Sequence, residues 1–405
     1  MLQLFKMALR DLGRNRRRSF FSALALGMGL ALLLLIAAVI AGEMRGSMET
    51  AIRLQSGHLQ VRAETYDEDK TSLAWEDLIE NPEQVAAQVA SLEPVQAATP
   101  RLYASGIAVL GKESAAVRIV GVDAASEANA PYRDGLVGGE FVKADDRNGI
   151  LVGQSLANKH GLRAGESFNL MVNTSNGDVD EQPFVIRGVY STRTPVLDEV
   201  TVIMPLAKAQ AFAQAGNRAS TIFILLKDRD RTRDVVEALQ TARYRILTYE
   251  QMNDILVQTE ALAGGYMIVI YLIVLAITAT VIVNTLIMAV FERTREIGIL
   301  SAIGMRGRRI MAMFFAESSL LAVGGIAIGL VLGGLLVAYA STVGFYIGDF
   351  GATDIPLGDT IYAYLTLGDA LTLTVLAFVV TLLAALYPAL LAARMEPVEA
   401  LRSGQ

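Results

Sequence analysis

Four long apolar stretches constrain this 405-residue chain more than any other feature of its sequence. They occupy residues 20–42, 263–291, 310–340 and 369–393. Each reaches the roughly 20 mostly apolar residues that a helix needs to cross a bilayer. The first stretch is longer than the ~7–15-residue apolar core of a cleaved signal peptide, which favours an uncleaved anchor. The sequence therefore predicts an α-helical membrane protein with four transmembrane helices.

Basic residues between the apolar stretches predict the orientation of the chain. Residues 1–19 carry six Lys or Arg side chains, residues 292–309 carry five and residues 394–405 carry two, whereas residues 341–368 carry none. Short basic segments stay on the cytoplasmic side of a membrane. We therefore expect cytoplasmic termini, with 1–19 as an amphipathic helix, a cytoplasmic segment at 292–309 and a short external loop at 341–368.

The remaining segment, residues 43–262, is expected to form one large extracytoplasmic domain. It contains 22 basic and 31 acidic residues, a balance that argues against nucleic acid as a partner, whereas the basic cytoplasmic segments suit membrane lipids. Alternating patterns predict hairpins at 102–122, turned at Gly111-Lys112, and at 168–190, turned at Asn176-Gly177. Helices are expected at 83–91, 154–160, 206–213 and 231–243. These elements predict a mixed α+β domain, with two subdomains.

The second apolar stretch is predicted to be joined to this domain by a helix. Thr248 and Gln251 have the spacing of a capping box, in which each side chain caps a backbone N–H at the start of a helix. The pattern predicts that this helix continues from Thr248 into the stretch at 263–291. A continuous helix of this kind would be stiff enough to carry movement.

Residues that could support catalysis are sparse. The stretch from Gly106 to Lys112 lacks the Ser or Thr of a phosphate-binding loop, since Glu113 follows, and is interpreted as a hairpin turn. The chain has no cysteine, and its two histidines, His58 and His160, are distant in sequence. We therefore expect no catalytic residues, no metal site and no cofactor in this chain.

Two features inside the third apolar stretch point to helix packing. Gly325, Gly329 and Gly333 recur at a spacing of four, which lets two helix backbones approach closely in a membrane. Glu317 is the carboxylate within this stretch, and a charge at such a position needs a partner. Because it lies two turns from the basic residues near Arg309, we interpret Glu317 as one member of a structural ion pair.

Three motifs resemble those of FtsX-like permeases, the family that includes the MacB-type and the lipoprotein-releasing LolC- and LolE-type subunits of ABC transporters. The first is ERTREIGILSAIG at residues 292–304, between the second and third apolar stretches. The others are RNRRR at residues 14–18 and the terminal segment at residues 387–402. The resemblance extends over essentially the whole chain, including a large domain of MacB periplasmic core type after the first helix.

The resemblance implies a function for residues 292–309. In this family the segment is a coupling helix that docks on an ATPase, and a coupling helix with exposed apolar residues requires a protein partner. The implied ATPase contacts are Arg293, Glu296, Ile297, Leu300 and Gly304. Two ATPase copies, which bind ATP and Mg²⁺, would assemble with two copies of this permease or with one copy and a related permease. The permease itself would be non-catalytic, would reside in the bacterial inner membrane and would convert ATP hydrolysis into movement of its outer domain.

The cargo class is left open among three alternatives. Residues 56–61, 188–198 and 202–206 resemble the lipoprotein-releasing branch, which favours lipoprotein release with a periplasmic carrier. A drug or antimicrobial-peptide exporter with an adaptor protein is the second alternative. The third is a regulator that activates a cell-wall hydrolase. A membrane-anchored enzyme is disfavoured because no catalytic set of residues is present.

Overall fold

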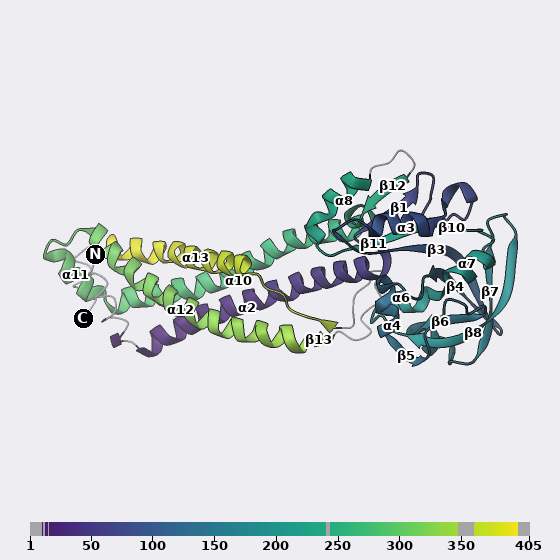
Figure 1. The fold of residues 1–405 in the computed structure, drawn as a ribbon. Helices are drawn as coiled ribbons and strands as arrows, with labels where there is room; N and C mark the ends of the chain where they lie inside the picture. Colours follow the sequence, from purple (N-terminus) through teal and green to yellow (C-terminus); the bar gives the residue numbers. More distant parts are fainter. Residues whose placement is uncertain (1–9, 11–12, 15, 240–243, 347–359, 396–405) are drawn as a thin grey trace. The chain divides into compact units, whose positions relative to one another are not determined.

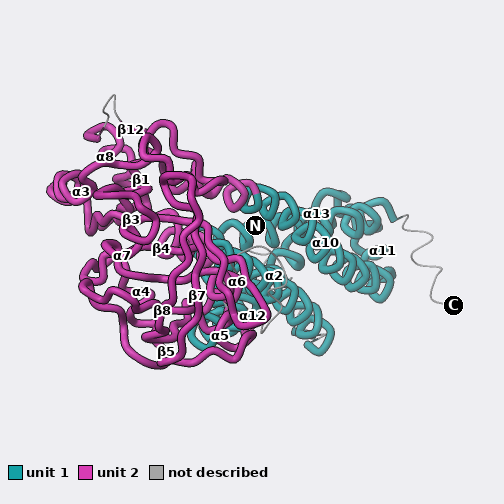
Figure 2. The backbone as a smooth tube through the Cα atoms, turned by 90° about the vertical axis from the view of Figure 1, so that its right-hand side faces the viewer, with its two compact units in different colours: residues 1–44, 259–345, 361–405 teal, residues 45–258, 346–360 magenta. Residues whose placement is uncertain are grey.

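A computed structural model describes residues 10, 13, 14, 16–239, 244–346 and 360–395 of the chain (Figure 1). Most of the segments expected at 1–19 and 394–405, and residues 347–359 of the loop expected at 341–368, therefore lie outside the described residues. The chain divides into a helical unit (residues 1–44, 259–345 and 361–405) and an α+β unit (residues 45–258 and 346–360), which are coloured separately in Figure 2.

Among the described residues, four helices are long and apolar enough to cross a membrane. They are α2 (Arg16–Ala51), α10 (Asp254–Glu292), α12 (Gly307–Val343) and α13 (Leu367–Ala393). The short helix α11 (Thr294–Ala302) lies between α10 and α12. Two-residue strands, β13 (Phe345–Tyr346) and β14 (Thr360–Ile361), lie between α12 and α13 in the chain. The predicted four-helix membrane architecture is confirmed.

Both α2 and α10 extend well past the apolar stretches that predicted them. After Ala51, α2 continues as a π-helical turn, η1 (Ile52–Ser56), which ends at Gly57 with a φ of 65°. The capping box at Thr248 is present as predicted, but its helix is only the single turn α9 (Tyr249–Met252). Asn253 interrupts the helix, and α10 begins anew at Asp254. The prediction of one continuous helix from Thr248 was therefore wrong, because Asn253 leaves the helical backbone conformation.

The α+β unit is built on one ten-stranded sheet with the strand order β12-β1-β11-β3-β4-β9-β6-β8-β5, while β7 pairs with β3 and β8. The strands are β1 (Leu59–Ala63), β3 (Val95–Leu110), β4 (Glu113–Val122), β5 (Leu136–Gly139), β6 (Gly149–Gly153), β7 (Ser167–Asn173), β8 (Val179–Tyr190), β9 (Thr201–Pro205), β11 (Thr221–Leu226) and β12 (Tyr244–Thr248). The strands β2 (Ile79–Glu80) and β10 (Arg218–Ala219) pair separately. Both predicted hairpins, β3–β4 and β7–β8, are confirmed.

Short helices cover this sheet. They are α3 (Pro82–Ala90), α4 (Ala130–Asp134), α5 (Gln154–His160), α6 (Pro195–Val200), α7 (Leu206–Phe212) and α8 (Thr232–Leu239), with the 3₁₀ turns η2 (Trp75–Asp77), η3 (Glu127–Asn129) and η4 (Arg229–Arg231). The four predicted helices correspond to α3, α5, α7 and α8, and residues 240–243 of the last lie outside the described residues.

Two large hydrophobic cores lie on this sheet at different positions along it. One joins α3 and α8 to β1 and β11 through residues such as Val89, Val235 and Ile224. The other joins α5 and α7 to β4, β6 and β8 through Leu156, Phe212 and Phe184. The two expected subdomains are therefore two cores that share one sheet, and β3 is long enough to serve both.

Candidate coupling site between α10 and α12

The segment between α10 and α12 is a short helix between two sharp turns. Arg293 lies at the N-cap of α11 with φ −110° and ψ 14°, so the helical backbone breaks directly after α10. At the other end Gly304 has a φ of 94°, a conformation that glycine adopts without strain. No atom lies within 4 Å of a Cβ built on Gly304, so the backbone turn alone requires glycine there. The predicted contact residue Gly304 is thus the residue that ends α11.

A buried ion pair joins the start of α11 to α12. Arg293 Nη1 lies 3.5 Å from Glu317 Oε2, and each side chain is only 3% exposed. A charge that is withdrawn from water needs a partner of opposite sign, and here Arg293 and Glu317 are partners of each other. Glu317 therefore has the role of an ion-pair partner that the sequence suggested, while Arg293 points into the helical unit.

Ile297 faces the interior of the helical unit as well. It is 2% exposed and packs in a cluster with Val290, Ile310, Met313, Phe314, Ala389 and Ala392. This position differs from the expectation that Ile297 is an exposed ATPase contact. The physical reason is that α11 folds back beside the ends of α10, α12 and α13, which cover this side of it. Leu300, one turn further, is half-buried.

The exposed side of α11 is not the side of the implied contact Ile297. Ile299 is 44% and Ile303 is 78% exposed, and Arg295 and Ala302 are exposed beside them. These four residues recur at spacings of three and four, so they share one side of the helix. We call this set the α11 outer face. The sequence places Ile299 and Ile303 on the same apolar face of the helix as Ile297, and only the packing decides which of these residues is covered.

Two exposed ion pairs connect the basic N-terminal segment with this region. Arg14 Nη2 lies 2.8 Å from Glu296 Oε1, and Arg18 pairs with Glu292 at the end of α10. Exposed pairs of this kind contribute about 0–1 kcal/mol of stability. The predicted contact residue Glu296 thus lies at the surface with a partner from its own chain. Neither pair alone fixes the position of α11, which depends on Arg293 and Ile297.

The glycines of α12 lie against α2. A Cβ built on Gly325 would come within 2.3 Å of Leu26, and one on Gly329 within 2.8 Å of Leu30. A Cβ on Gly333 would come within 2.8 Å of Leu34. The stripe predicted to pack against another helix therefore faces α2 along three successive turns. A larger residue at any of these positions would push the two helices apart.

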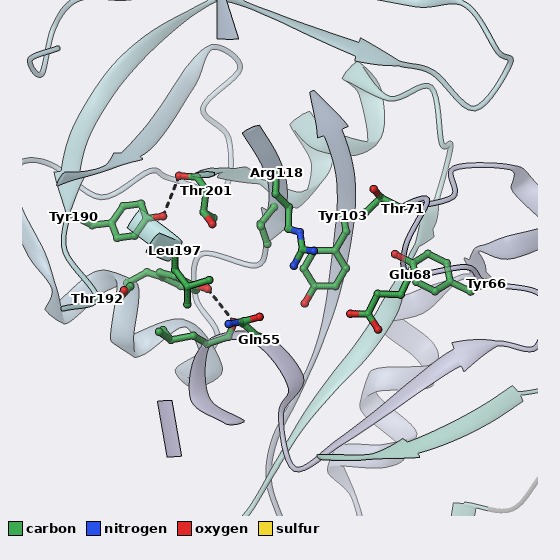
Figure 3. A pocket seen from close by; sticks show the side chains of 13 residues that line it. Gln55, Tyr66, Glu68, Thr71, Tyr103, Arg118, Tyr190, Thr192, Leu197 and Thr201 are labelled. Atoms are coloured by element: carbon green, nitrogen blue, oxygen red, sulfur yellow. Dashed lines mark hydrogen bonds between the residues drawn. The ribbon is translucent and has the colours of Figure 1, made fainter. Parts of the chain in front are cut away.

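The α+β unit contains a small internal cavity of about 40 Å³ (Figure 3). A single water needs roughly 10–15 Å³ of such space, so the cavity has the size for a few waters and not for a cargo molecule. Burial raises the pKa of Tyr66 and of Tyr132, which line it, to about 12. Both phenols are therefore neutral at physiological pH and unsuited to act as bases. Within the described ranges, no group of three or more metal-ligating side chains comes together.

Two protein-family models match the chain. The model of the MacB-like periplasmic core domain matches residues 19–242, and the model of the FtsX-like permease C-terminal region matches residues 268–397. The first of these covers the α+β unit almost completely. The second covers the candidate coupling site, including α11 and both turns beside it.

Individual proteins are also similar to this chain. The lipoprotein-releasing system transmembrane protein LolE of Haemophilus influenzae is 24% identical over 405 residues, which cover 95% of this chain and 94% of LolE. The macrolide export ATP-binding/permease protein MacB of Nitrobacter winogradskyi is 27% identical over 282 residues, which cover 65% of this chain and 40% of MacB. Among solved structures, the periplasmic region of MacB from Actinobacillus actinomycetemcomitans aligns with 50% of this chain and 94% of that region, with 17% identity and a TM-score of 0.35. The chain thus spans nearly all of the LolE relative and less than half of the MacB relative.

Proposed function

This chain belongs to the FtsX-like ABC transporter permeases that carry a MacB-like periplasmic core domain, and from this premise we propose that it is the permease subunit of a lipoprotein-releasing transporter. The observation that carries the cargo class is the similarity to LolE along nearly the full length of both chains. The MacB relative is matched over less than half of its own length. Other MacB relatives match 98% of this chain at 26–27% identity, so the match along nearly the full length of LolE itself is why we favour lipoprotein release over macrolide export.

The proposed topology places α11 and the basic N-terminal segment in the cytoplasm of a bacterial cell, with the α+β unit on the other side of the inner membrane. The exposed arginines near α11 support this orientation, because short basic segments are retained on the cytoplasmic side. Arg295, Arg306, Arg308 and Arg309 are all exposed there. The same arginines suit anionic lipid headgroups at the membrane surface.

The proposed partner of the α11 outer face is an ABC ATPase. In this proposal the ATPase, and not this chain, binds ATP and Mg²⁺. Ile299 and Ile303 are large apolar side chains that are 44% and 78% exposed, and a groove on the ATPase that removed this surface from water would gain about 1–2 kcal/mol for each. Arg293 and Ile297 support the contact from behind, since they fix α11 to α12 and to the neighbouring helix ends. Two permease chains and two ATPase chains form the working complex in this proposal.

Movement would pass from the ATPase to the α+β unit along the long helices. Rotation of α11 shifts the adjoining ends of α10 and α12, to which it is tied by short turns and the Arg293–Glu317 pair. The helices α2 and α10 each contribute residues to both units of the chain, so they are the covalent routes for this movement. The α+β unit then releases cargo from the outer leaflet to a soluble carrier.

Reconstitution with defined cargo tests this proposal. Proteoliposomes that contain the permease, its partner ATPase and an acylated lipoprotein should release the lipoprotein to a carrier protein only when ATP is supplied. The permease without the ATPase should hydrolyse no ATP and release nothing. ATP-dependent macrolide export without lipoprotein release would contradict the proposed cargo and favour an exporter. Activation of a cell-wall hydrolase without movement of either cargo would contradict the transport function itself.

A further inference from the structure

Arg101 occupies a junction in the ten-stranded sheet. It lies within β3, whose residues before it pair with β11 and whose residues after it pair with β4. Arg101 itself is the residue at which the two ladders overlap, opposite Thr221 on β11 and opposite Val122 on β4. The part of β3 that serves the core of α3 and α8 therefore meets the part that serves the core of α5 and α7 at this residue.

The side chain of Arg101 reaches the end of the first long helix. Its Nη1 donates a hydrogen bond of 2.9 Å to the carbonyl oxygen of Leu54, in the π-helical turn that ends α2. Its Nη2 donates to the carbonyl of Ala128 and, at 2.9 Å, to Oδ1 of Asn129. Tyr132 donates a second hydrogen bond, of 3.0 Å, to the same Leu54 carbonyl. One guanidinium thus connects the helix end with η3, which lies just after β4.

The guanidinium of Arg101 is buried, and its contacts with Leu54, Ala128 and Asn129 are inside the protein. The side chain is 0% exposed, and its guanidinium lies 3.6 Å from the centre of the Phe223 ring. Among the described residues no carboxylate forms an ion pair with it. Its charge is instead opposed by carbonyl oxygens, including that of Leu54 at the C-terminal end of a long helix, where the helix dipole is negative. Lysine cannot reproduce this arrangement, because an ammonium lacks the planar fork that reaches two acceptors on different elements.

We propose that Arg101 is the positioning residue that clamps the end of α2 and η1 to the sheet, so that movement of this helix reaches both cores of the α+β unit together. The inference rests on the proposed transport function, because it assigns the place where movement enters the domain. Without the clamp, the helix end would shift relative to β3 while the sheet itself remains folded. The ATPase would then turn over without driving the release of cargo.

Distance measurements within the α+β unit test the clamp without reference to transport. The chain has no cysteine, so Gly46→Cys on α2 and Asp145→Cys on an exposed loop give two defined spin-label sites in the full-length permease. A Cβ on Gly46 meets nothing within 4 Å, so its label is tolerated. The distance distribution should broaden in Arg101→Met, and Arg101→Lys should give an intermediate width. The control Arg231→Met, which removes a half-exposed arginine paired with Glu93 and Asp234, should leave the distribution narrow.

The second measurement separates a positioning role from a purely structural one. In proteoliposomes, Arg101→Met should lower ATP-dependent release roughly tenfold, as for the loss of one or two hydrogen bonds to a charged group, while ATP turnover stays at the wild-type rate. An unchanged distance distribution in Arg101→Met would overturn the clamp and leave the transport function standing. If Arg101→Met broadened the distance distribution but released as much lipoprotein per ATP as the wild type, the role of Arg101 in passing movement to the α+β unit would be overturned. If the wild-type permease released no lipoprotein when ATP is supplied, that result would instead count against the proposed function.

Discussion

Arg293 and Glu317 form an ion pair 3.5 Å apart in which both side chains are 3% exposed, and this pair connects the turn before α11 with α12. The pair belongs to two segments that lie 24 residues apart in the chain. It fixes the direction in which α11 continues after α10. The position of the α11 outer face depends on it, since Ile297 alone provides only apolar packing.

Removal of one member of this pair should destabilise the helical unit more than removal of both. Arg293→Met or Glu317→Gln leaves an uncompensated buried charge, which costs about 3–5 kcal/mol. The double variant leaves none and should recover much of the loss. Thermal unfolding of the full-length protein in detergent, followed by helical circular dichroism, measures the effect. If the stability loss of the double variant equalled the sum of the losses of the two single variants, the two charges would not interact.

The glycine stripe of α12 offers a comparison between two nearby positions. Gly329→Ala places a Cβ 2.8 Å from Leu30 Cβ and 2.9 Å from the carbonyl oxygen of Gly27, and overpacking of this kind costs about 1–3 kcal/mol. Gly334→Ala is the matched control, because nothing lies within 4 Å of its added Cβ. We expect a lower melting temperature for the first variant and no decrease for the second. A similar decrease in both would mean that close contact with α2 is not the reason for the glycines.

The stability of the α+β unit should depend on the ionisation of Asp198. Burial raises the pKa of Asp198 to about 6, and the hydrogen bonds from Thr192 and Ser191 only partly offset this effect. Because the folded state holds the proton more tightly than the unfolded state, the charged carboxylate costs stability above pH 6. That cost, roughly 3 kcal/mol, disappears as the pH falls from 6 towards 4.

Comparison with Asp198→Asn isolates this contribution. His58 acts in the opposite direction, since burial lowers its pKa and its protonation destabilises the fold as the pH falls below its ordinary value. Because both proteins contain His58, its effect cancels in their difference. As the pH falls from 7 to 4.5, the melting temperature of the wild type should rise relative to that of the variant. Fluorescence of Trp75, the single tryptophan of the chain and a residue of the α+β unit, reports this transition. A difference that does not change with pH would contradict the raised pKa.

The sequence predicted the elements of this protein better than their contacts. Length and apolarity identified the four long helices, and Asn176-Gly177 and Gly111-Lys112 identified two hairpins, because these signals are local. The contacts of α11 depend on helix ends that are distant in the chain. Ile297 and Ile299 are both isoleucines of one short helix, and tertiary packing covers the first and exposes the second. Arg101 gave no signal either, since a lone arginine in a strand indicates neither burial nor a link to Leu54.

The proposed transport function depends on the ATPase contact of α11, and copurification at matched permease levels tests this contact most directly. Ile303→Asp would place a carboxylate in an apolar contact at a cost of about 3 kcal/mol or more, which lowers the association constant roughly a hundredfold. Ile255→Asp is the matched control, because Ile255 is 70% exposed at the start of α10, far along the chain from α11. We predict that the ATPase is lost from Ile303→Asp and retained by Ile255→Asp. Undiminished ATPase binding by a folded Ile303→Asp permease would contradict the claim that the α11 outer face couples this chain to its ATPase.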